Sequence, residues 1–304
     1  MKNKKKILVL CGGISKERPV SIQTGNACND ALKLMGYKTI KLDPKKNILK
    51  NIKEVNPDIV MNCLHGRYGE DGQIQKILEK LKVPYTHSGV KASEDAMNKI
   101  KSKKIFIKNR ILTPNYKSIK KISDLSNKIS KEKFIIKPAN EGSSFGVKIF
   151  DSLNKKNLLD IKKHLLKYKN LIQEEFIDGQ EVQTAILNNK VLGSVEIRPK
   201  RKFYDYKAKY SSLAKTLHVI PPKINKEIND KINKAALKAH KSLGCKGVTR
   251  SDFIVSKDKK VYILELNTQP GMTRLSLVPE IAKFYGLSFK KLVNWIVKDA
   301  GINR

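Results

Sequence analysis

The chain has 304 residues, long enough for two or three domains, and 40% of them are hydrophobic, as in an ordinary soluble globular protein. It carries 63 lysines and arginines against 28 aspartates and glutamates, a formal net charge of +35. Such an excess suits a nucleic-acid-binding protein. The lysines are nevertheless spread along the whole chain, without a basic stripe interleaved with aromatic residues and without a zinc-finger or KH-type motif. We therefore expect no nucleic-acid partner and a surface that attracts anionic substrates.

The cysteines and the N-terminal residues indicate the cellular compartment in which the protein is expected. Four cysteines, at positions 11, 28, 63 and 245, have no paired spacing, which indicates a reducing environment and no disulfide framework. The lysine-rich start resembles the beginning of a signal peptide, but the apolar run at residues 7–10 is far too short for one. No stretch approaches the length of a membrane span. We expect a cytoplasmic protein with no membrane partner.

The first part of the chain alternates strands with helices. The pattern predicts strands at residues 6–10, 38–42 and 58–64 and helices at residues 20–35 and 71–81. This order is typical of a small parallel α/β domain, with its loops gathered at the carboxyl ends of the strands, where ligands bind. We place this N-terminal domain at residues 1–93.

A second unit is expected at residues 94–180 and a third at residues 181–304. In the second, the sequence predicts a helix at 95–107, strands at 133–138 and 147–150 around a glycine-rich loop, and a strand at 171–176. The third is strand-rich, passes through a long aromatic and basic loop at 198–222, and ends in helices at 225–243 and 287–297.

Two loops follow predicted strands of the first domain. Gly12-Gly-Ile-Ser-Lys-Glu17 precedes a helix whose N-terminus attracts anions, and Glu17 beside it suits a substrate ammonium; a plain tight turn is the alternative. In the second loop, residues 65–72, Asp71 is the expected N-cap of the next helix. His65 stands at the end of a strand, either lining the cleft or packed within the fold.

The loop Asn140-Glu-Gly-Ser-Ser-Phe-Gly146 lies between two predicted strands and can present backbone N–H groups to phosphates. It lacks the spacing of a Walker A loop, and a simple hairpin turn is the alternative. Lys137, at the end of the preceding strand, and Lys99, on the preceding helix, are candidate phosphate ligands, unless they are solvated like most lysines.

Near the C-terminus, two apolar runs surround a polar turn. A turn centred on residues 258–259 places Asp252 opposite Glu265 and Arg250 opposite Asn267, all on one face of the hairpin. Two carboxylates about 5 Å apart repel by roughly 3 kcal/mol at an effective dielectric near 20. A cation between them removes that cost, and carboxylate and amide oxygens suit Mg²⁺ on a nucleotide. A solvated hairpin with its acids balanced by lysines is the alternative.

Taken in order, these motifs resemble the D-alanine:D-alanine ligases of the ATP-grasp superfamily. The resemblance rests on the loop at residues 12–21, His65-Gly-Arg-Tyr-Gly-Glu-Asp-Gly72, the segment at residues 137–144, Tyr204-Asp-Tyr-Lys-Ala-Lys-Tyr210, Arg250-Ser-Asp252 and Glu265-Leu-Asn-Thr-Gln-Pro-Gly-Met272. It runs from about residue 6 to about residue 295. It implies a mixed α/β fold, α+β in parts: an N-terminal parallel α/β domain followed by two ATP-grasp domains that clamp ATP.

The resemblance also implies roles for individual residues. The ATP-binding residues would be Lys99, Lys137, Ser144, Glu174, Glu175, Phe176, Ile177 and Glu181. Two Mg²⁺ or Mn²⁺ ions would be held by Asp252, Glu265 and Asn267. The catalytic residues would be Glu17, Ser143, Tyr210, Arg250 and Gly271, and the substrate-binding residues His65, Lys209, Ser276 and Leu277.

The implied reaction joins two D-alanine molecules through an acylphosphate, at the expense of ATP, for peptidoglycan precursor synthesis. The loop at residues 198–222 would act as a lid that excludes water from this intermediate. The resemblance further implies a homodimer. Leu275 departs from the family pattern, which often has histidine there. D-serine or D-lactate as the second substrate is therefore the alternative, and a nucleic-acid-binding protein is the alternative of another class.

Overall fold

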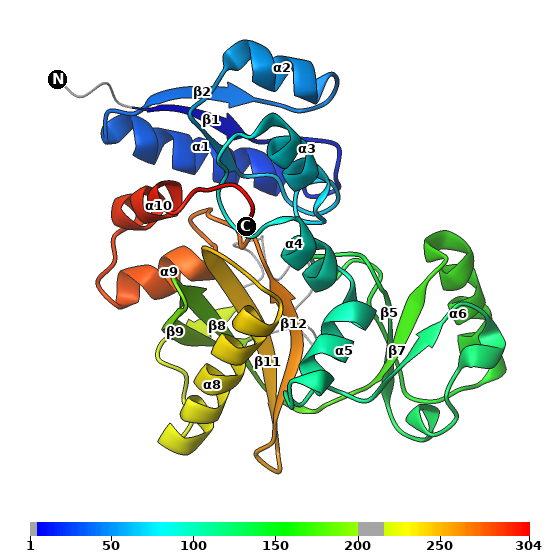
Figure 1. Ribbon diagram of the computed structural model, residues 1–304. Coiled ribbons are helices and arrows are strands. Elements are labelled where there is room, and N and C mark those ends of the chain that lie inside the picture. Colours follow the sequence, from blue (N-terminus) through cyan, green and yellow to red (C-terminus); the bar gives the residue numbers. More distant parts are fainter. Residues whose placement is uncertain (1–4, 200–215) are drawn as a thin grey trace.

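The computed structural model describes residues 5–199 and 216–304. Lys209, Tyr210 and most of the expected lid lie outside these residues. The described part contains three sheets with helices packed against them (Figure 1). Within it, no helix is both long and apolar enough to cross a membrane.

The first sheet is parallel, as predicted, with β1 (Lys6–Leu10) between β2 (Lys38–Leu42) and β3 (Ile59–Asn62). Its helices are α1 (Arg18–Leu34), α2 (Ile48–Val55) and α3 (Gln73–Leu81). The sequence did not predict α2. The expected cap of α3 was also wrong: Gly72 is the N-cap, and Asp71 accepts hydrogen bonds from the backbone of Tyr68 in the loop and of Gln73, the first residue of α3.

The second sheet is antiparallel, in the order β4 (Tyr116–Ile119), β7 (Leu171–Glu175), β5 (Phe134–Pro138) and β6 (Lys148–Phe150). Two 3₁₀ turns, Ile122–Asp124 and Ile129–Lys131, and α6 (Lys155–Tyr168) accompany it.

The single helix expected at residues 95–107 is in fact two, α4 (Val90–Met97) and α5 (Lys99–Lys108). Asn98 between them has an extended backbone, and its side chain accepts hydrogen bonds from the backbone of Ile100 and Lys101. An asparagine that caps a new helix ends the old one, so Lys99 becomes the first residue of α5.

The third sheet has the order β10 (Leu217–Val219), β9 (Lys190–Arg198), β8 (Gly179–Leu187), β11 (Val248–Ser256) and β12 (Val261–Asn267). Among the described residues, this part of the chain contains the helices α8 (Lys226–Ser242), α9 (Leu277–Phe284) and α10 (Phe289–Lys298). The helix α9 was not predicted.

The predicted pairing of the last hairpin is confirmed at its outer end, where Asp252 faces Glu265 and Arg250 faces Asn267. Nearer the turn the register differs by one residue, because a β-bulge lies between Asp252 and Phe253 in the ladder. The turn therefore centres on Asp258 alone, and the bulge restores the register before the acids are reached.

One apolar core joins the first and third sheets. Buried residues of β1 and α1, such as Val9 and Leu32, belong to the same cluster as Ile281 of α9 and Ile296 of α10. Figure 1 shows α10 beside α1, and the Tyr37 hydroxyl donates to the side chain of Asn294, at 2.9 Å. The second sheet has a cluster of its own with α6. The domain boundaries expected after residues 93 and 180 stay a prediction.

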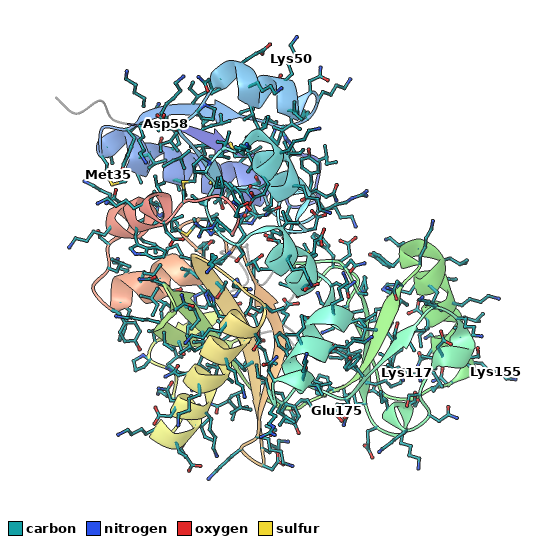
Figure 2. The ribbon with its side chains drawn as sticks, viewed as in Figure 1. Met35, Lys50, Asp58, Lys117, Lys155 and Glu175 are labelled. Atoms are coloured by element: carbon teal, nitrogen blue, oxygen red, sulfur yellow. The ribbon has the colours of Figure 1, made fainter. Side chains whose placement is uncertain are left out.

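Apart from the buried Lys99, Lys103 and Lys137, most described lysines lie dispersed over the surface. Figure 2 labels Lys50, Lys117 and Lys155, all exposed, on α2, β4 and α6. All four cysteines are free thiols and buried.

Candidate functional site

A cavity lies where the loops of all three sheets converge. Its lining comes from the two N-terminal loops, the glycine-rich loop, the junction of α4 and α5, the outer ends of β11 and β12, and the segment leading into α9. Among the lining residues are Glu17, His65, Glu70, Lys99, Glu141, Gly142, Ser143, Arg250, Glu265, Asn267, Gly271, Leu275, Ser276 and Leu277.

Glu17 connects the N-terminal loop to the glycine-rich loop. The Ser143 hydroxyl donates a hydrogen bond to the Glu17 carboxylate, which is only 6% exposed. Ser143 and Ser144 both have positive φ, 47° and 59°, so this part of the loop takes a left-handed turn that presents Ser143 to Glu17. Gly66 lies against the same carboxylate, and a Cβ atom there would overlap Oε2 of Glu17. The close approach therefore requires glycine at position 66.

His65 lies in this cavity, buried between two partners. Its Nδ1 is 2.9 Å from Oε1 of Glu70, and its Nε2 is 3.0 Å from the Thr24 hydroxyl. Both ring nitrogens are thus engaged, which fixes the orientation of the imidazole. Glu70 was not among the expected site residues. The sequence signal was its place in the same loop, five positions after His65.

Lys99 contacts both Glu265 near the end of β12 and the glycine-rich loop. Its Nζ lies 3.1 Å from Oε2 of Glu265 and 2.7 Å from the carbonyl oxygen of Glu141, and the residue is buried. A buried ammonium between a carboxylate and a glycine-rich loop is suited to receiving a phosphate that enters the cavity.

The face predicted for the last hairpin carries the expected polar groups. Arg250 forms a bidentate ion pair with Asp252, with Nε–Oδ1 and Nη2–Oδ2 distances of 2.7 and 3.0 Å. The amide oxygen of Asn267 accepts a hydrogen bond from the backbone of Gln269, at 2.8 Å. Among the residues the structure describes, no three His, Cys, Asp or Glu side chains cluster as a metal site. Asp252, Glu265 and Asn267 offer two carboxylates and one amide.

A second cavity lies between the second and third sheets and shares Glu265 with the first. It contains most of the residues expected to bind ATP: Lys137, Ser144, Glu174, Glu175, Phe176, Ile177 and Glu181. The carboxylate of Glu175 accepts hydrogen bonds from the backbone N–H and the side-chain amide of Asn115, at 3.0 and 2.9 Å. Asp252 also lines this cavity.

Glu174 lies beneath the second cavity between two lysines. Its Oε2 is 2.8 Å from Nζ of Lys137, and its Oε1 is 3.2 Å from Nζ of Lys103. Burial alone would raise the pKa of Glu174, but the two ammonium groups hold it below its usual value. Lys103, fully buried, shares one carboxylate with a second lysine, and burial lowers its pKa to about 8. Sequence reasoning missed Lys103, since nothing local distinguishes it from the exposed lysines around it.

The segment after β12 completes the first cavity. Ser276 is the N-cap of α9, and its hydroxyl accepts a hydrogen bond from the backbone of Thr273, at 2.9 Å. A Cβ atom at Gly271 would lie 2.8 Å from that hydroxyl, so a larger residue there would displace the Ser276 side chain. Leu277 is buried, whereas Leu275 is 48% exposed. Lys209 and Tyr210 lie outside the described residues.

The fold and these two adjoining cavities define an ATP-grasp enzyme. The family model described as the C-terminus of D-Ala-D-Ala ligase matches residues 111–298, and the model described as its N-terminus matches residues 38–88. The chain belongs to the D-alanine–D-alanine ligase family, which confirms the resemblance noted in the sequence.

Full-length relatives agree. The chain is 55% identical to a D-alanine–D-alanine ligase from Pelagibacter ubique, over 99% of each chain. The crystal structure of the D-alanine–D-alanine ligase from Bacillus anthracis superposes with a TM-score of 0.85 at 34% identity, covering 97% of each chain. The structure of the Bacillus anthracis enzyme complexed with ATP matches with a TM-score of 0.83 at 31% identity, again over 97% of each chain.

Proposed function

We propose that this protein joins two D-alanine molecules into D-alanyl-D-alanine with the hydrolysis of ATP to ADP and phosphate. The observation that carries this proposal is the pair of adjoining cavities joined at Glu265, one with Glu17 and Ser143 at its wall and the other with Lys137 and Glu181. One cavity suits a small zwitterion and the other a nucleotide. The dipeptide would enter peptidoglycan precursor synthesis.

ATP binds in the second cavity. The segment Glu174-Glu-Phe-Ile177 supplies an apolar wall and backbone groups for the adenine, and Glu181 binds the ribose hydroxyls. Lys137, held by Glu174, and Lys99, at the junction with the first cavity, bind the phosphates. Ser144 and the rest of the glycine-rich loop cover them with backbone N–H groups.

Two Mg²⁺ or Mn²⁺ ions fit the face formed by Asp252, Glu265 and Asn267. This donor set consists only of oxygen atoms, which hard cations prefer, and it is too small to complete a coordination shell without phosphate oxygens and water. When bound, the ions supply positive charge that offsets the charge of the phosphates.

In the first step, Glu17 binds the ammonium of the first D-alanine, with Ser143 holding the Glu17 carboxylate in place. One oxygen of the substrate carboxylate attacks the γ-phosphorus of ATP. The bond from this phosphorus to the bridging oxygen breaks, ADP leaves, and an acylphosphate forms. The lysines act by position and charge rather than by proton transfer.

In the second step, the amine of the second D-alanine attacks the acyl carbon. The negative oxygen of the tetrahedral intermediate is stabilised by Arg250 and by the N–H of Gly271. Phosphate then leaves, the nitrogen loses a proton, and the peptide bond forms. Ser276 and Leu277 bind the carboxylate of the second substrate. The family resemblance assigns Lys209 to the same carboxylate and Tyr210 to the first-substrate site, and both lie outside the described residues.

The test is phosphate release and dipeptide formation from ATP with each D-amino acid alone and in pairs. We expect D-alanine alone to give one dipeptide per phosphate. Faster product formation from D-alanine with D-serine or D-lactate would assign the alternative second substrate. Sub-micromolar, sequence-selective nucleic-acid binding at physiological salt would point to the other class.

Two further parts of the proposal rest on family membership. We place the enzyme in the cytoplasm, which the four free cysteines support. We also expect a homodimer, which light scattering on the purified protein would test.

A further inference from the structure

Two buried side-chain amides meet between the N-terminal and C-terminal walls of the first cavity. Asn62 ends β3, and Gln269 lies in the segment between β12 and α9. Nδ2 of Asn62 donates a hydrogen bond to Oε1 of Gln269, at 2.6 Å. The two residues are 1% and 2% exposed. Neither residue lines the cavity, so a contact with substrate does not account for them.

On the N-terminal side, the amide pair holds the loop that carries His65 and Glu70. Oδ1 of Asn62 accepts a hydrogen bond from the backbone N–H of Leu64, at 3.1 Å, and Gln269 donates to the carbonyl of the same Leu64. Nδ2 of Asn62 also donates to the carbonyl of Gly69, at 3.0 Å. Leu64 and Gly69 directly precede His65 and Glu70, so the amides fix the backbone at both ends of this loop.

On the C-terminal side, Gln269 is tied to the strand end that carries the proposed metal ligands. Its backbone N–H donates to Oδ1 of Asn267, at 2.8 Å. Gln269 is also two positions before Gly271, whose N–H is assigned above to the oxyanion. The amide pair thus forms a polar connection from the backbone next to His65 and Glu70 to the Asn267 side chain, and the chain continues from Gln269 through Pro270 to Gly271.

Stability alone does not explain buried amides at this place. The two walls are already held together by the apolar core that contains Val9, Met272 and Ile281. Apolar contacts are non-directional and tolerate small displacements, whereas a fully paired amide network has one preferred geometry. Both hydrogens of the Asn62 amide are used, which leaves the pair little freedom to shift.

We propose that Asn62 and Gln269 are a positioning pair that sets the distance between the first-substrate side of the cavity, at His65 and Glu70, and the reaction side, at Asn267 and Gly271. This inference rests on the proposed ligase function. The pair touches neither substrate nor nucleotide and acts by holding the two reactants in line, where a displacement of about 1 Å is enough to slow the reaction.

The test compares the kinetics of the full-length variants Asn62→Ala, Gln269→Ala and the double variant with their thermal stability. We expect each single variant to lower kcat for dipeptide formation roughly tenfold and to leave KM for ATP within about twofold, because alignment is lost and nucleotide binding is not. The double variant should be no slower than the slower single variant, since both remove the same connection.

The matched control is Gln75→Ala. Gln75 of α3 is equally buried and donates to the same Gly69 carbonyl, at 2.9 Å, but this hydrogen bond stays within the N-terminal wall. This variant should melt at a lower temperature and keep kcat within about twofold of the wild type. If Gln269→Ala melts below the assay temperature, Gln269→Met takes its place, because methionine keeps the length of the side chain without the amide.

Three results would each overturn the positioning role. The first is a wild-type kcat in the Gln269 variant, and the second is a loss of kcat in the double variant equal to the product of the two single losses. The third is a loss of kcat in Gln75→Ala as large as that in the Asn62 and Gln269 variants. In these cases the ligase function stands, because the wild-type protein forms dipeptide. A wild-type protein that forms no dipeptide overturns both proposals.

Discussion

Lys99 and Glu265 form an ion pair at the boundary of the two cavities, with Nζ 3.1 Å from Oε2. The side chain of Lys99 is 8% exposed and that of Glu265 is 27% exposed. A lysine thus lies beside a carboxylate that is also a candidate metal ligand, and both face the space that a phosphate would enter. Glu265 is the residue on which the two halves of the proposed site depend most directly.

Glu265→Gln should lower dipeptide formation on the order of 100-fold or more and leave the fold intact, because a neutral amide replaces the charge that would face the proposed metal ions. Steady-state rates across a Mg²⁺ titration and circular dichroism provide the measurement. Asp258→Asn, at the exposed turn of the same hairpin, is the control and should keep normal rates. Near-normal activity of Glu265→Gln at low Mg²⁺ would contradict the metal assignment.

Ser143→Ala should raise KM for the first D-alanine roughly 10- to 100-fold and change KM for ATP much less. The variant removes the hydroxyl that donates to Glu17, and a hydrogen bond to a charged group contributes roughly 1.5–3 kcal/mol. Initial rates over a matrix of D-alanine and ATP concentrations separate the two effects. Ser152→Ala, exposed ahead of α6, serves as the control. A larger effect on ATP than on D-alanine would refute the role of Glu17 and Ser143 at the first substrate.

Lys103→Met should cost about 3 kcal/mol of unfolding free energy, because removing one partner of a buried ion pair leaves the remaining charge poorly compensated. Urea denaturation measures the loss. Lys104→Met, at the neighbouring exposed position of α5, should change stability by less than about 0.5 kcal/mol. Equal free energies of unfolding for the two variants would show that the contact of Lys103 with Glu174 adds nothing to stability.

Stability should fall as the pH drops below about 6.5, because two buried histidines must stay neutral in the folded state. Burial lowers the pKa of His87 to about 3, and that of His240 to about 4. Between these values and 6.5 the unfolded chain binds more protons than the folded one, so each histidine costs about 2 kcal/mol on going from pH 6.5 to pH 4.5.

Denaturation curves of His87→Asn, His240→Gln and the wild type, recorded at several pH values, give the free energy of unfolding. In each variant this free energy should decline less steeply with falling pH than in the wild type. Asparagine tolerates the positive φ of 69° found at position 87. Around pH 8, the difference in unfolding free energy between each variant and the wild type should not depend on pH. A decline as steep as that of the wild type in both variants would exclude the histidines as its cause.

The sequence by itself determined the elements whose patterns are local. Strand-like and helical sequence patterns located β1, β2 and α8 to within a residue or two, and the pairing of Asp252 with Glu265 followed from the alternation of strand side chains. The motifs were sufficient to recognise the family. These features depend on neighbours in the chain, so they survive without knowledge of the tertiary structure.

Other features were decided by packing. The bulge after Asp252 shifts the pairing of β11 with β12 by one residue, and nothing local in the sequence announces it. Lys103 and its exposed neighbour Lys104 look alike in sequence, yet only one is sealed against Glu174. Asn62 and Gln269 are ordinary polar residues until the fold brings them together. Burial and long-range partners change the energy of a charge or an amide by several kcal/mol, and only the tertiary structure supplies them.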